Sequence, residues 1–503
     1  MRVLIFHGYL LRGTGSNIYN ASLARALADL GHEVHLVCQE SRTDGLSFVD
    51  GRRCTVHVPD IEGLLPLYVA DEYEGFTAVP FPALDDAQIE RYVDLNSRAV
   101  TEVVDAVAPD VALANHLIMG PVILARALGG RVPYAVKVHG SALEYVVRPH
   151  RDRFLSWARE GLAGASAVLV GSRHTAESLW EVMDEPGLPA RTRLGPPGVD
   201  VHSFHPRSAE EAAEGLLGLA RSLEGAEAAT WGGEAGAAEA VRALNPAHDR
   251  LVGYVGKLIV SKGVDLLLAA WPLVVAQVPA ARLCVVGFGT YRAGLGQIVD
   301  ALANADLEAL GEVVARGREL EGGPPGELRY LRAFVDELSA ERRAAYLDAA
   351  PRAAERVHFT GRLEHDALPG LLPSFEAQVV PSTFPEAFGM VAAEAAACGA
   401  LPVSAAHSGL AEVTSVLAPA LDEPLRPLLS FSPGSRAVPE LADRLVRWLS
   451  LDASERSRAG AELARMARSR FGWESVAQGV IAAAQGHLAE LPRVPSHDAG
   501  AQP

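Results

Sequence analysis

The sequence predicts an α/β protein built from two doubly wound parallel-sheet domains that face a central cleft. Short apolar runs alternate with amphipathic helical stretches, which is the pattern of βαβ units around a sheet buried on both faces. The chain has 503 residues and is therefore too long for one ordinary domain. A stretch rich in Ala, Glu and Gly, without a strand signal, separates two such alternating regions.

The first alternating region predicts an N-terminal domain over residues 1–200. Its strand candidates are "RVLIFHG", "HEVHLVC", "DVALANH", "PYAVKVHG" and "SAVLVGS". Helical patterns such as "NASLARALADLG" and "LNSRAVTEVVDAVA" lie between them. The segment "LGPPGVDVHSFHP" at 194–206 interrupts the alternation, so we expect residues 201–248 to form a linker or insertion.

The second region predicts a C-terminal domain over residues 249–472. Its strand candidates are "LVGYVGKL", "ARLCVVGFG", "RVHFTGRL", "AQVVPS" and "LPVSAA". A charged, Ala-rich insertion at about 300–355 is expected to form helical hairpins. Residues 473–490 predict an amphipathic helix that packs back onto one of the two domains, the N-terminal one being a candidate. Residues 491–503 predict a disordered tail.

Composition excludes several classes of protein. The formal net charge is −17, which argues against a nucleic-acid partner, because neutralising phosphates requires a surplus of Lys and Arg. No apolar stretch reaches the roughly 18 residues that a transmembrane helix needs. The opening "MRVLIFHGYLLRG" is typical of a first strand rather than a signal peptide. The cysteines, Cys38, Cys54, Cys284 and Cys398, form no C-x-x-C, so we expect free thiols and a cytoplasmic protein.

A pair of lysines marks the first candidate site. Ligands of open α/β sheets bind beyond the carboxyl ends of the strands. Lys257 and Lys262 lie in such a strand-to-helix loop, in "YVGKLIVSKGVDLLLAAW", and the only other lysine is Lys137. A compact ammonium group beside the free N–H groups of a helix start suits a phosphate. The alternative is two solvated surface lysines.

A pair of glutamates marks the second candidate site, in "VPSTFPEAFGMVAAEAAACGALPV". A helix starting near Phe388 or Gly389 offers first-turn N–H groups to a diphosphate, and the glycine permits close approach. Glu386, in the preceding loop, can accept hydrogen bonds from hydroxyls. Glu394, inside the helix, can accept bonds from a cis-diol such as a ribose. The alternative is an N-terminal cap and a salt-bridged core acid.

The first domain carries weaker signals. "RGTGSNIYN" is a Gly-rich loop whose candidates are Gly13, Gly15 and Asn17. A dinucleotide-binding loop would add a third glycine, which is missing, and an acid after the second strand, where Glu40 keeps this alternative open.

Histidines follow several strands of the first domain. His139 stands at a strand end in "KVHGSALEYVVR", and His7 and His116 occupy similar places. This pattern is typical of residues that line a cleft, although a histidine in such a place is as often a core residue.

Several motifs together resemble the retaining glycosyltransferases of the GT-B fold, family 4 (glycosyl transferases group 1). They are "PPGVDVHSFHP", "GKLIVSKGVDLLLAA", "VVGFG", "VHFTGRL" and "PSTFPEAFGMVAAEAAACGALPVSAAHSGLAEV". The resemblance covers nearly the whole chain except 207–247, 300–355 and the tail. It implies two Rossmann-like domains, the N-terminal one on the acceptor side and the C-terminal one binding a nucleotide sugar.

The resemblance assigns roles to the residues of the second domain. It implies that Glu394 binds the donor ribose, that Glu386 contacts hydroxyls of the donor sugar, and that Lys257 and Lys262 neutralise the diphosphate. Further donor contacts through the backbone are implied at Gly389, Met390 and Val391 for the sugar and diphosphate, and at Arg362 and Leu363 for the base. Members usually carry Arg in place of Lys257. Ser408, in "HSGLAEV", replaces the first of two glycines, so we expect a stiffer loop.

The resemblance also assigns roles in the first domain. It places His139 near the reacting end of the donor sugar, as a catalytic residue with Lys257, Lys262 and Glu386. It brings the Gly-rich loop, with Gly15 and Asn17, to the donor phosphate. The candidates for acceptor contacts are Glu144, Arg148 and Arg173.

The implied reaction moves a hexose-type sugar from a nucleotide-diphosphate sugar to an acceptor hydroxyl with retention. UDP is the first choice of donor nucleotide and GDP the second; the acceptor is an unidentified glycan, small molecule or lipid. No Asp-x-Asp pair suits a divalent ion, so we expect no metal and no cofactor, with cationic groups stabilising the leaving group. The alternatives are a sugar-nucleotide epimerase of the same architecture and a non-catalytic GT-B-like binding protein.

Overall fold

The chain forms two compact units in the computed structural model. The described residues are 1–12, 15–68, 75–224 and 232–495. The first unit contains residues 1–198 and 471–503, and the second unit contains residues 199–470. Among the described residues, no helix combines the length and the apolar character that crossing a membrane requires.

The first unit is built on a seven-stranded parallel sheet with the order β3-β2-β1-β6-β7-β8-β9. Its strands are β1 (Arg2–Phe6), β2 (Glu33–Val37), β3 (Cys54–His57), β6 (Val111–Asn115), β7 (Tyr134–Val138), β8 (Ala167–Val170) and β9 (Thr192–Leu194). A separate parallel pair contains β4 (Leu64–Leu67) and β5 (Thr77–Pro80). Strand β1 pairs with β2 on one side and β6 on the other, so the switch point lies at β1 and β6.

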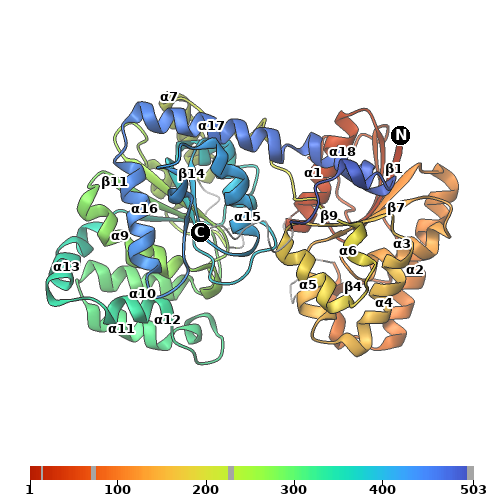
Figure 1. Ribbon diagram of the computed structural model, residues 1–503, viewed down its shortest axis with the longest axis horizontal. Helices are drawn as coiled ribbons and strands as arrows, with labels where there is room; N and C mark the ends of the chain where they lie inside the picture. Colours follow the sequence, from red (N-terminus) through yellow and green to blue (C-terminus); the bar gives the residue numbers. More distant parts are fainter. Residues whose placement is uncertain (13–14, 69–74, 225–231, 496–503) are drawn as a thin grey trace. The chain divides into compact units, whose positions relative to one another are not determined.

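Helices cover both faces of this sheet. On one face lie α1 (Gly15–Asp29) and α18 (Trp473–Ala484), which pack against each other and against the strands (Figure 1). The other face carries α2 (Asp86–Val107), α3 (Gly120–Leu128) and α4 (Arg151–Ala163), and α5 (Arg173–Met183) and α6 (Leu188–Arg191) complete the unit. The late helix therefore packs on the N-terminal unit. It ends at Ala484, earlier than predicted, and a short turn, η9 (Leu488–Glu490), follows it.

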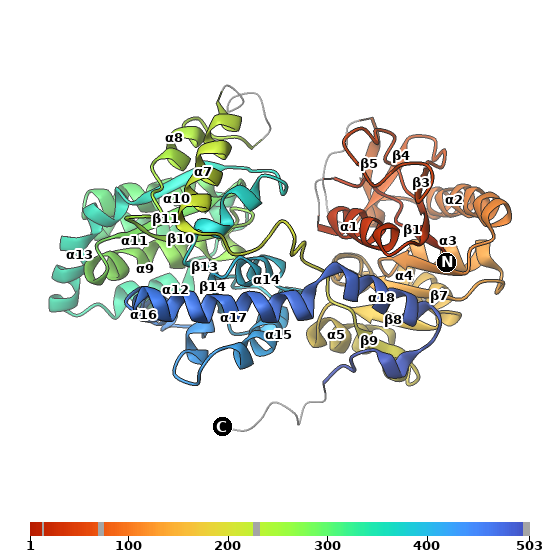
Figure 2. The ribbon, with the colours of Figure 1, turned by 90° about the horizontal axis from the view of Figure 1, so that it is seen from above.

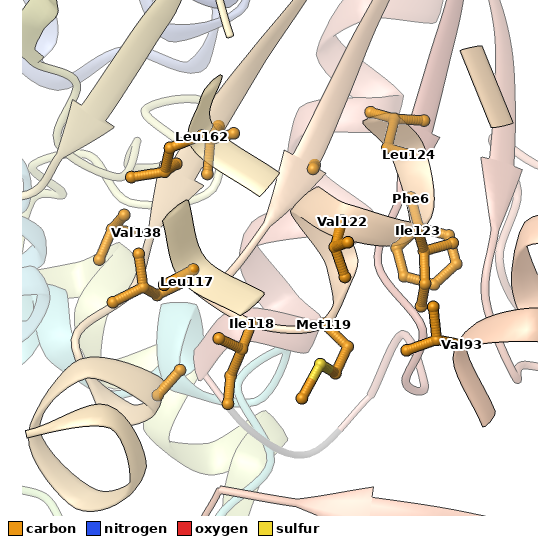
Figure 3. Close-up of a cluster of buried hydrophobic side chains, with 14 of the residues drawn as sticks. Phe6, Val93, Leu117, Ile118, Met119, Val122, Ile123, Leu124, Val138 and Leu162 are labelled. Carbon is orange, nitrogen blue, oxygen red and sulfur yellow. The ribbon is translucent and has the colours of Figure 1, made fainter. Parts of the chain in front are cut away.

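Alternate residues of β1 enter two different cores. Leu4 and Phe6 pack with α2, α3 and α4, whereas Val3 and Ile5 pack with α1 and α18. Figure 3 shows the first of these cores, with Phe6 beside Ile123 of α3. Successive side chains of a strand point to opposite faces, so a strand covered on both faces is apolar throughout.

The first residues of the predicted disordered tail, 491–495, are ordered, and the tail is hydrogen-bonded to the first unit. The N–H group of Leu194 in β9 donates a hydrogen bond to the Pro492 carbonyl at 2.9 Å. The rest of the predicted disordered tail, residues 496–503, lies outside the described residues.

The second unit is built on a six-stranded parallel sheet with the order β12-β11-β10-β13-β14-β15. The strands are β10 (Arg250–Val255), β11 (Ala281–Val286), β12 (Val357–Gly361), β13 (Ala377–Val380), β14 (Leu401–Ala405) and β15 (Ser430–Phe431). Strand β10 pairs with both β11 and β13, so its carboxyl end and that of β13 mark the switch point. The predicted fold class, two doubly wound parallel sheets, is confirmed.

The helices of the second unit include those of both predicted insertions. They are α7 (Ala209–Leu223), α8 (Ala237–Arg242), α9 (Val264–Gln277), α10 (Arg292–Ala303), α11 (Leu307–Arg316), α12 (Arg329–Asp336), α13 (Ala340–Ala354), α14 (Met390–Ala397), α15 (Ser408–Leu417), α16 (Ala437–Leu449) and α17 (Ala453–Phe471). In the segment 201–248, α7 packs on α8 (Figure 2), and α8 packs on β12. This segment is therefore a helical part of the second unit. The insertion at about 300–355 is helical as predicted.

Candidate functional site

The predicted lysine and glutamate of the second unit meet at its switch point. Lys262 precedes α9, and Glu386 lies in the loop between β13 and α14. The Lys262 ammonium group forms an ion pair with the Glu386 carboxylate, and both side chains are partly exposed. The Ser382 hydroxyl donates to Oε1 of Glu386 at 2.6 Å. Lys257 stands at the end of β10 with an exposed side chain, while its carbonyl accepts from the Tyr254 hydroxyl at 2.8 Å.

A closed ring of hydrogen bonds holds the Glu386 loop. The Glu386 N–H donates to Oγ of Ser408 at 2.8 Å, and this Oγ lies 2.9 Å from Nδ1 of His407. Nε2 of His407 lies 2.7 Å from the Ser382 carbonyl. A carbonyl can only accept, so Nε2 carries the proton, and in the neutral ring Nδ1 accepts from the Ser408 hydroxyl. The Ser382 hydroxyl closes the ring on the Glu386 carboxylate, so four residues fix this loop.

Ser408 and Gly409 explain the local sequence at the start of α15. Ser408 has φ 50°, a left-handed conformation that is uncommon for a residue with a side chain. The Gly409 N–H donates to the Glu386 carbonyl at 2.9 Å, and a Cβ at Gly409 would lie 2.7 Å from that oxygen. This close approach requires a glycine at position 409. Ser408 has a strained backbone conformation, and its hydroxyl takes part in the ring of hydrogen bonds.

The start of α14 follows the predicted pattern. The helix begins at Met390 after Gly389, and no side chain caps its first turn. Its N–H groups, including that of Val391, therefore lie next to the Glu386 loop with positive dipole character, as an anion site requires. Glu394 stands in the second turn and is 3% exposed.

Glu394 is bound by a residue that the sequence did not single out. Nε2 of His365, in the loop after β12, lies 2.8 Å from Oε1 of Glu394. The predicted alternative of a salt-bridged core acid is thus partly realised, but with a histidine. The only signal in the sequence was the need of a buried carboxylate for a donor, and that need does not identify the donor.

The loop of the predicted base contacts is joined to the segment 201–248. The Arg362 N–H donates to the Gly232 carbonyl at 2.9 Å, and Gly233 forms an antiparallel bridge with Gly361. The Arg362 guanidinium pairs with Glu364 at 2.7 Å. Leu363, the next residue, is partly exposed.

The first unit places a chain of neutral polar groups at its switch point. Nε2 of His7 contacts Oδ1 of Asn17 at 2.9 Å, and the Asn20 amide contacts Nδ1 of His7 at 3.0 Å. The Asn115 amide donates to Oδ1 of Asn20 at 2.8 Å. Oδ1 of Asn115 lies 2.8 Å from Nε2 of His139. The predicted residues Asn17 and His139 therefore belong to one network, whose asparagines at positions 20 and 115 were not predicted.

These histidines are held in the neutral form. Burial lowers the pKa of His7 to about 4, against smaller opposing effects of hydrogen bonds to the Asn17 side chain and the Leu10 backbone. Burial also lowers the pKa of His139 well below its ordinary value, and nearby basic groups lower it further. His116 is likewise buried with a lowered pKa, its φ is 69°, and its ring nitrogens have no hydrogen-bond partner among the described residues.

The candidates for acceptor contacts are already paired with carboxylates. Arg148 follows a π-helical turn, η2 (Leu143–Val147), and binds Glu144 and Glu181, each at 3.1 Å. Arg173 begins α5 and binds Glu177 at 2.6 Å.

The Gly-rich loop of the first unit is tied to the end of β2. Gly15 is the first residue of α1, and Gly13 lies outside the described residues. The Glu40 carboxylate accepts from the Leu11 N–H at 3.3 Å and the Arg42 N–H at 3.3 Å. Glu40 therefore anchors its own loops, which weakens the dinucleotide alternative.

Several solved glycosyltransferase structures share the fold of this chain. HepE of Anabaena, solved with UDP and glucose, superposes with a TM-score of 0.56 at 17% identity and covers 98% of this chain and 100% of its own. Sucrose-phosphate synthase from Thermosynechococcus elongatus gives 0.54 at 18% identity, over 97% and 99% of the two chains. Together with the two doubly wound units, these likenesses define a GT-B fold.

The family follows from the sequence matches. Residues 14–198 match the glycosyl transferase 4-like domain, and residues 333–416 match the glycosyl transferases group 1 domain. The chain belongs to the family 4 GT-B glycosyltransferases, and the resemblance drawn from its motifs is confirmed.

One curated relative is the D-inositol 3-phosphate glycosyltransferase of Mycobacterium tuberculosis, 26% identical over 294 residues. The match covers 58% of this chain and 43% of the relative, so the chain spans less than half the length of the curated relatives it matches.

Proposed function

We propose that this chain transfers a hexose-type sugar from a nucleotide-diphosphate sugar to an acceptor hydroxyl. UDP is the first choice of nucleotide and GDP the second. The observation that carries the proposal is the cluster of Lys262, Glu386 and the uncapped start of α14 at the switch point of the second unit. The solved neighbour from Anabaena, which was crystallised with UDP-glucose, supports the first choice.

The proposed mechanism begins with an exchange of partners. In the structure Lys262 pairs with Glu386. A donor diphosphate beside the start of α14 would take the ammonium group of Lys262, with Lys257 as a second cation. The Glu386 carboxylate would then accept hydrogen bonds from the sugar hydroxyls. Positive groups aimed at the departing diphosphate stabilise the charge that develops in the transition state.

We propose retention of configuration by front-face attack, without a protein nucleophile. Glu386 is held by Lys262, by the Ser382 hydroxyl and by the ring through Ser408, which suits a group that orients hydroxyls. The neutral network around His139 in the first unit would bind uncharged hydroxyls. In this mechanism the two lysines and the helix start supply all the positive charge, so turnover should survive chelation.

A cytoplasmic location completes the proposal. All four cysteines are buried free thiols. Thiols remain reduced in the cytoplasm, so this state suits a chain that works there.

The test measures release of free nucleoside diphosphate from UDP- and GDP-sugars, with and without candidate acceptors, before and after treatment with EDTA. A glycosyltransferase releases the nucleotide when an acceptor hydroxyl is present. An epimerase converts the sugar without release, and a binding protein does neither. Loss of turnover on chelation would contradict the metal-free mechanism, and epimerisation without release would overturn the proposal.

A further inference from the structure

The buried carboxylate of Glu394 has a histidine, His365, as its hydrogen-bond partner. The Glu394 side chain is 4% exposed, and the rest of α14 contains only alanines, Met390 and Val391. A carboxylate in such surroundings is costly unless a hydrogen-bond donor accompanies it. Nε2 of His365 meets Oε1 at 2.8 Å, whereas Oε2 forms no hydrogen bond to any described residue.

His365 is placed where a ligand can also reach it. Its side chain is 37% exposed, far more than that of Glu394. It lies in the loop after β12, and α14 follows β13, so both residues stand beyond carboxyl ends of strands in one parallel sheet. In open sheets of this kind, ligands bind at this edge. The Phe204 ring, 5.3 Å from the His365 ring, closes one side of the imidazole.

We propose that His365 is a positioning residue that fixes the Glu394 carboxylate for the donor ribose and thereby makes the site selective for ribonucleotides. This inference rests on the proposed function, because it takes Glu394 as the ribose-binding group. With Oε1 held by His365, the carboxylate cannot rotate freely, and Oε2 is left to accept a hydrogen bond from a ribose hydroxyl. A preorganised acceptor avoids the entropic cost of ordering the group on binding.

The charges around His365 support this arrangement. Burial alone would lower the pKa of His365, but the hydrogen bond and charge of Glu394, with the charges of Asp200 and Asp366, raise it above its ordinary value. The charged groups that raise this pKa are all carboxylates. The charged pair forms fully below the ordinary pKa of histidine and is lost as pH rises through the raised pKa.

The experiment measures nucleotide binding to the full chain by calorimetry. The probe is whichever of UDP, GDP and ADP binds most tightly, together with its 2′-deoxy and 3′-deoxy counterparts. The variants are His365→Leu, which removes the donor, His365→Gln, which keeps an N–H donor, and Glu394→Gln. The matched control is His248→Leu, because His248 is an exposed histidine of the same unit outside the site.

A donor to a buried carboxylate is worth enough that we expect His365→Leu to weaken ribonucleotide binding roughly tenfold. The same change should abolish the preference for the ribonucleotide over its deoxy analogues. His365→Gln should restore most of the affinity and most of the preference, and His248→Leu should change neither the affinity nor the preference. Wild type should bind the ribonucleotide more tightly than His365→Gln, and this difference in affinity should shrink as pH rises above neutrality. Because the two proteins are compared at each pH, the ionisation of the nucleotide itself cancels.

The outcomes separate this inference from the proposed function. If His365→Leu keeps wild-type affinity and ribose preference while Glu394→Gln loses them, the inference is wrong and the ribose assignment stands. If Glu394→Gln also binds normally, or if wild type binds no nucleotide, the proposed donor site fails. Equal loss in His365→Leu and His365→Gln, with unchanged melting temperatures, would likewise overturn the positioning role.

Discussion

The two units share one architecture but present opposite chemistry at their switch points. The second unit places there an ammonium group and a carboxylate that are only partly buried. The first unit places there buried asparagines and histidines that are neutral, joined in one hydrogen-bonded chain. Charged groups that remain hydrated can exchange partners at low cost, whereas buried neutral groups hold fixed geometry. We infer that the second unit is built to capture a charged ligand and the first to orient uncharged hydroxyls.

The largest expected effect tests the charged half of this comparison. Lys262→Ala removes the cation that faces Glu386, and we expect turnover to fall by roughly two to three orders of magnitude. Steady-state release of nucleoside diphosphate measures it. Lys262→Arg, which keeps the charge, serves as the matched control and should retain most activity. Unchanged turnover in Lys262→Ala would remove the central claim about the second unit.

Acid should destabilise the first unit through its neutral histidines. The folded-state pKa of His7 is about 4 and its ordinary value is 6.5, so the unfolded chain binds the extra proton between these values. The contribution of His7 to the free energy of unfolding is therefore fully present above pH 6.5 and is lost as pH falls toward 4, by about 3 kcal/mol. Chemical denaturation followed at several pH values measures it. His7→Gln should flatten this dependence, and an unchanged slope would show that His7 takes up no proton on unfolding.

Asn115→Ala should affect the role of the first unit without affecting nucleotide binding by the second unit. Asn115 joins Asn20, His139 and the Phe6 carbonyl, so its loss leaves buried partners unsatisfied at a cost of about 1–3 kcal/mol. We expect lower turnover but the same thermal shift on addition of nucleotide. A lost nucleotide shift in a folded Asn115→Ala protein would contradict the division of labour between the units.

Ser408 offers the smallest and most specific effect. Ser408→Gly relieves a left-handed backbone but loses the hydrogen bond from the Glu386 N–H, so the net change in stability should stay within about 1 kcal/mol. Turnover should fall several-fold, since Glu386 loses its anchor, while nucleotide affinity stays constant. Ser408→Ala keeps the strain and loses the bond, so it should be the less stable of the two. The opposite order of stability would show that the left-handed backbone at Ser408 is not strained, and unchanged turnover in both variants would show that the hydroxyl does not hold the loop.

Much of the fold could be predicted because its signals are local. Every predicted strand run contains a strand, and α14 begins at Met390, close to the predicted start. Strands buried on both faces appear as continuous apolar runs. Strands β3 to β5, β9 and β15 were missed, because most are short and several have mixed burial. The segment 201–248 resembled a linker because it is rich in Ala, Glu and Gly and has no strand signal, and the packing of its helix α8 on β12 is a tertiary contact.

The site was predictable in its residue types but not in its pairings. The sequence alone marked Lys262, Glu386, Glu394, Asn17 and His139 as candidates, because charged or polar residues after strand ends are informative by position. Their partners could not be found in this way: His365 is distant in sequence from Glu394, and His407 and Ser408 close a ring with Glu386 through backbone atoms.

The sequence by itself determined two parallel-sheet lobes, the placement of charged residues in one and histidines in the other, and membership in a glycosyltransferase family. These depend on periodicity, composition and short motifs, which are properties of neighbouring residues. Only the tertiary structure decided that Lys262 pairs with Glu386, that Glu394 has a histidine partner, and that the helix near the C-terminus returns to the first unit. Such contacts arise from long-range packing, where the free energy depends on which distant groups come within hydrogen-bonding distance.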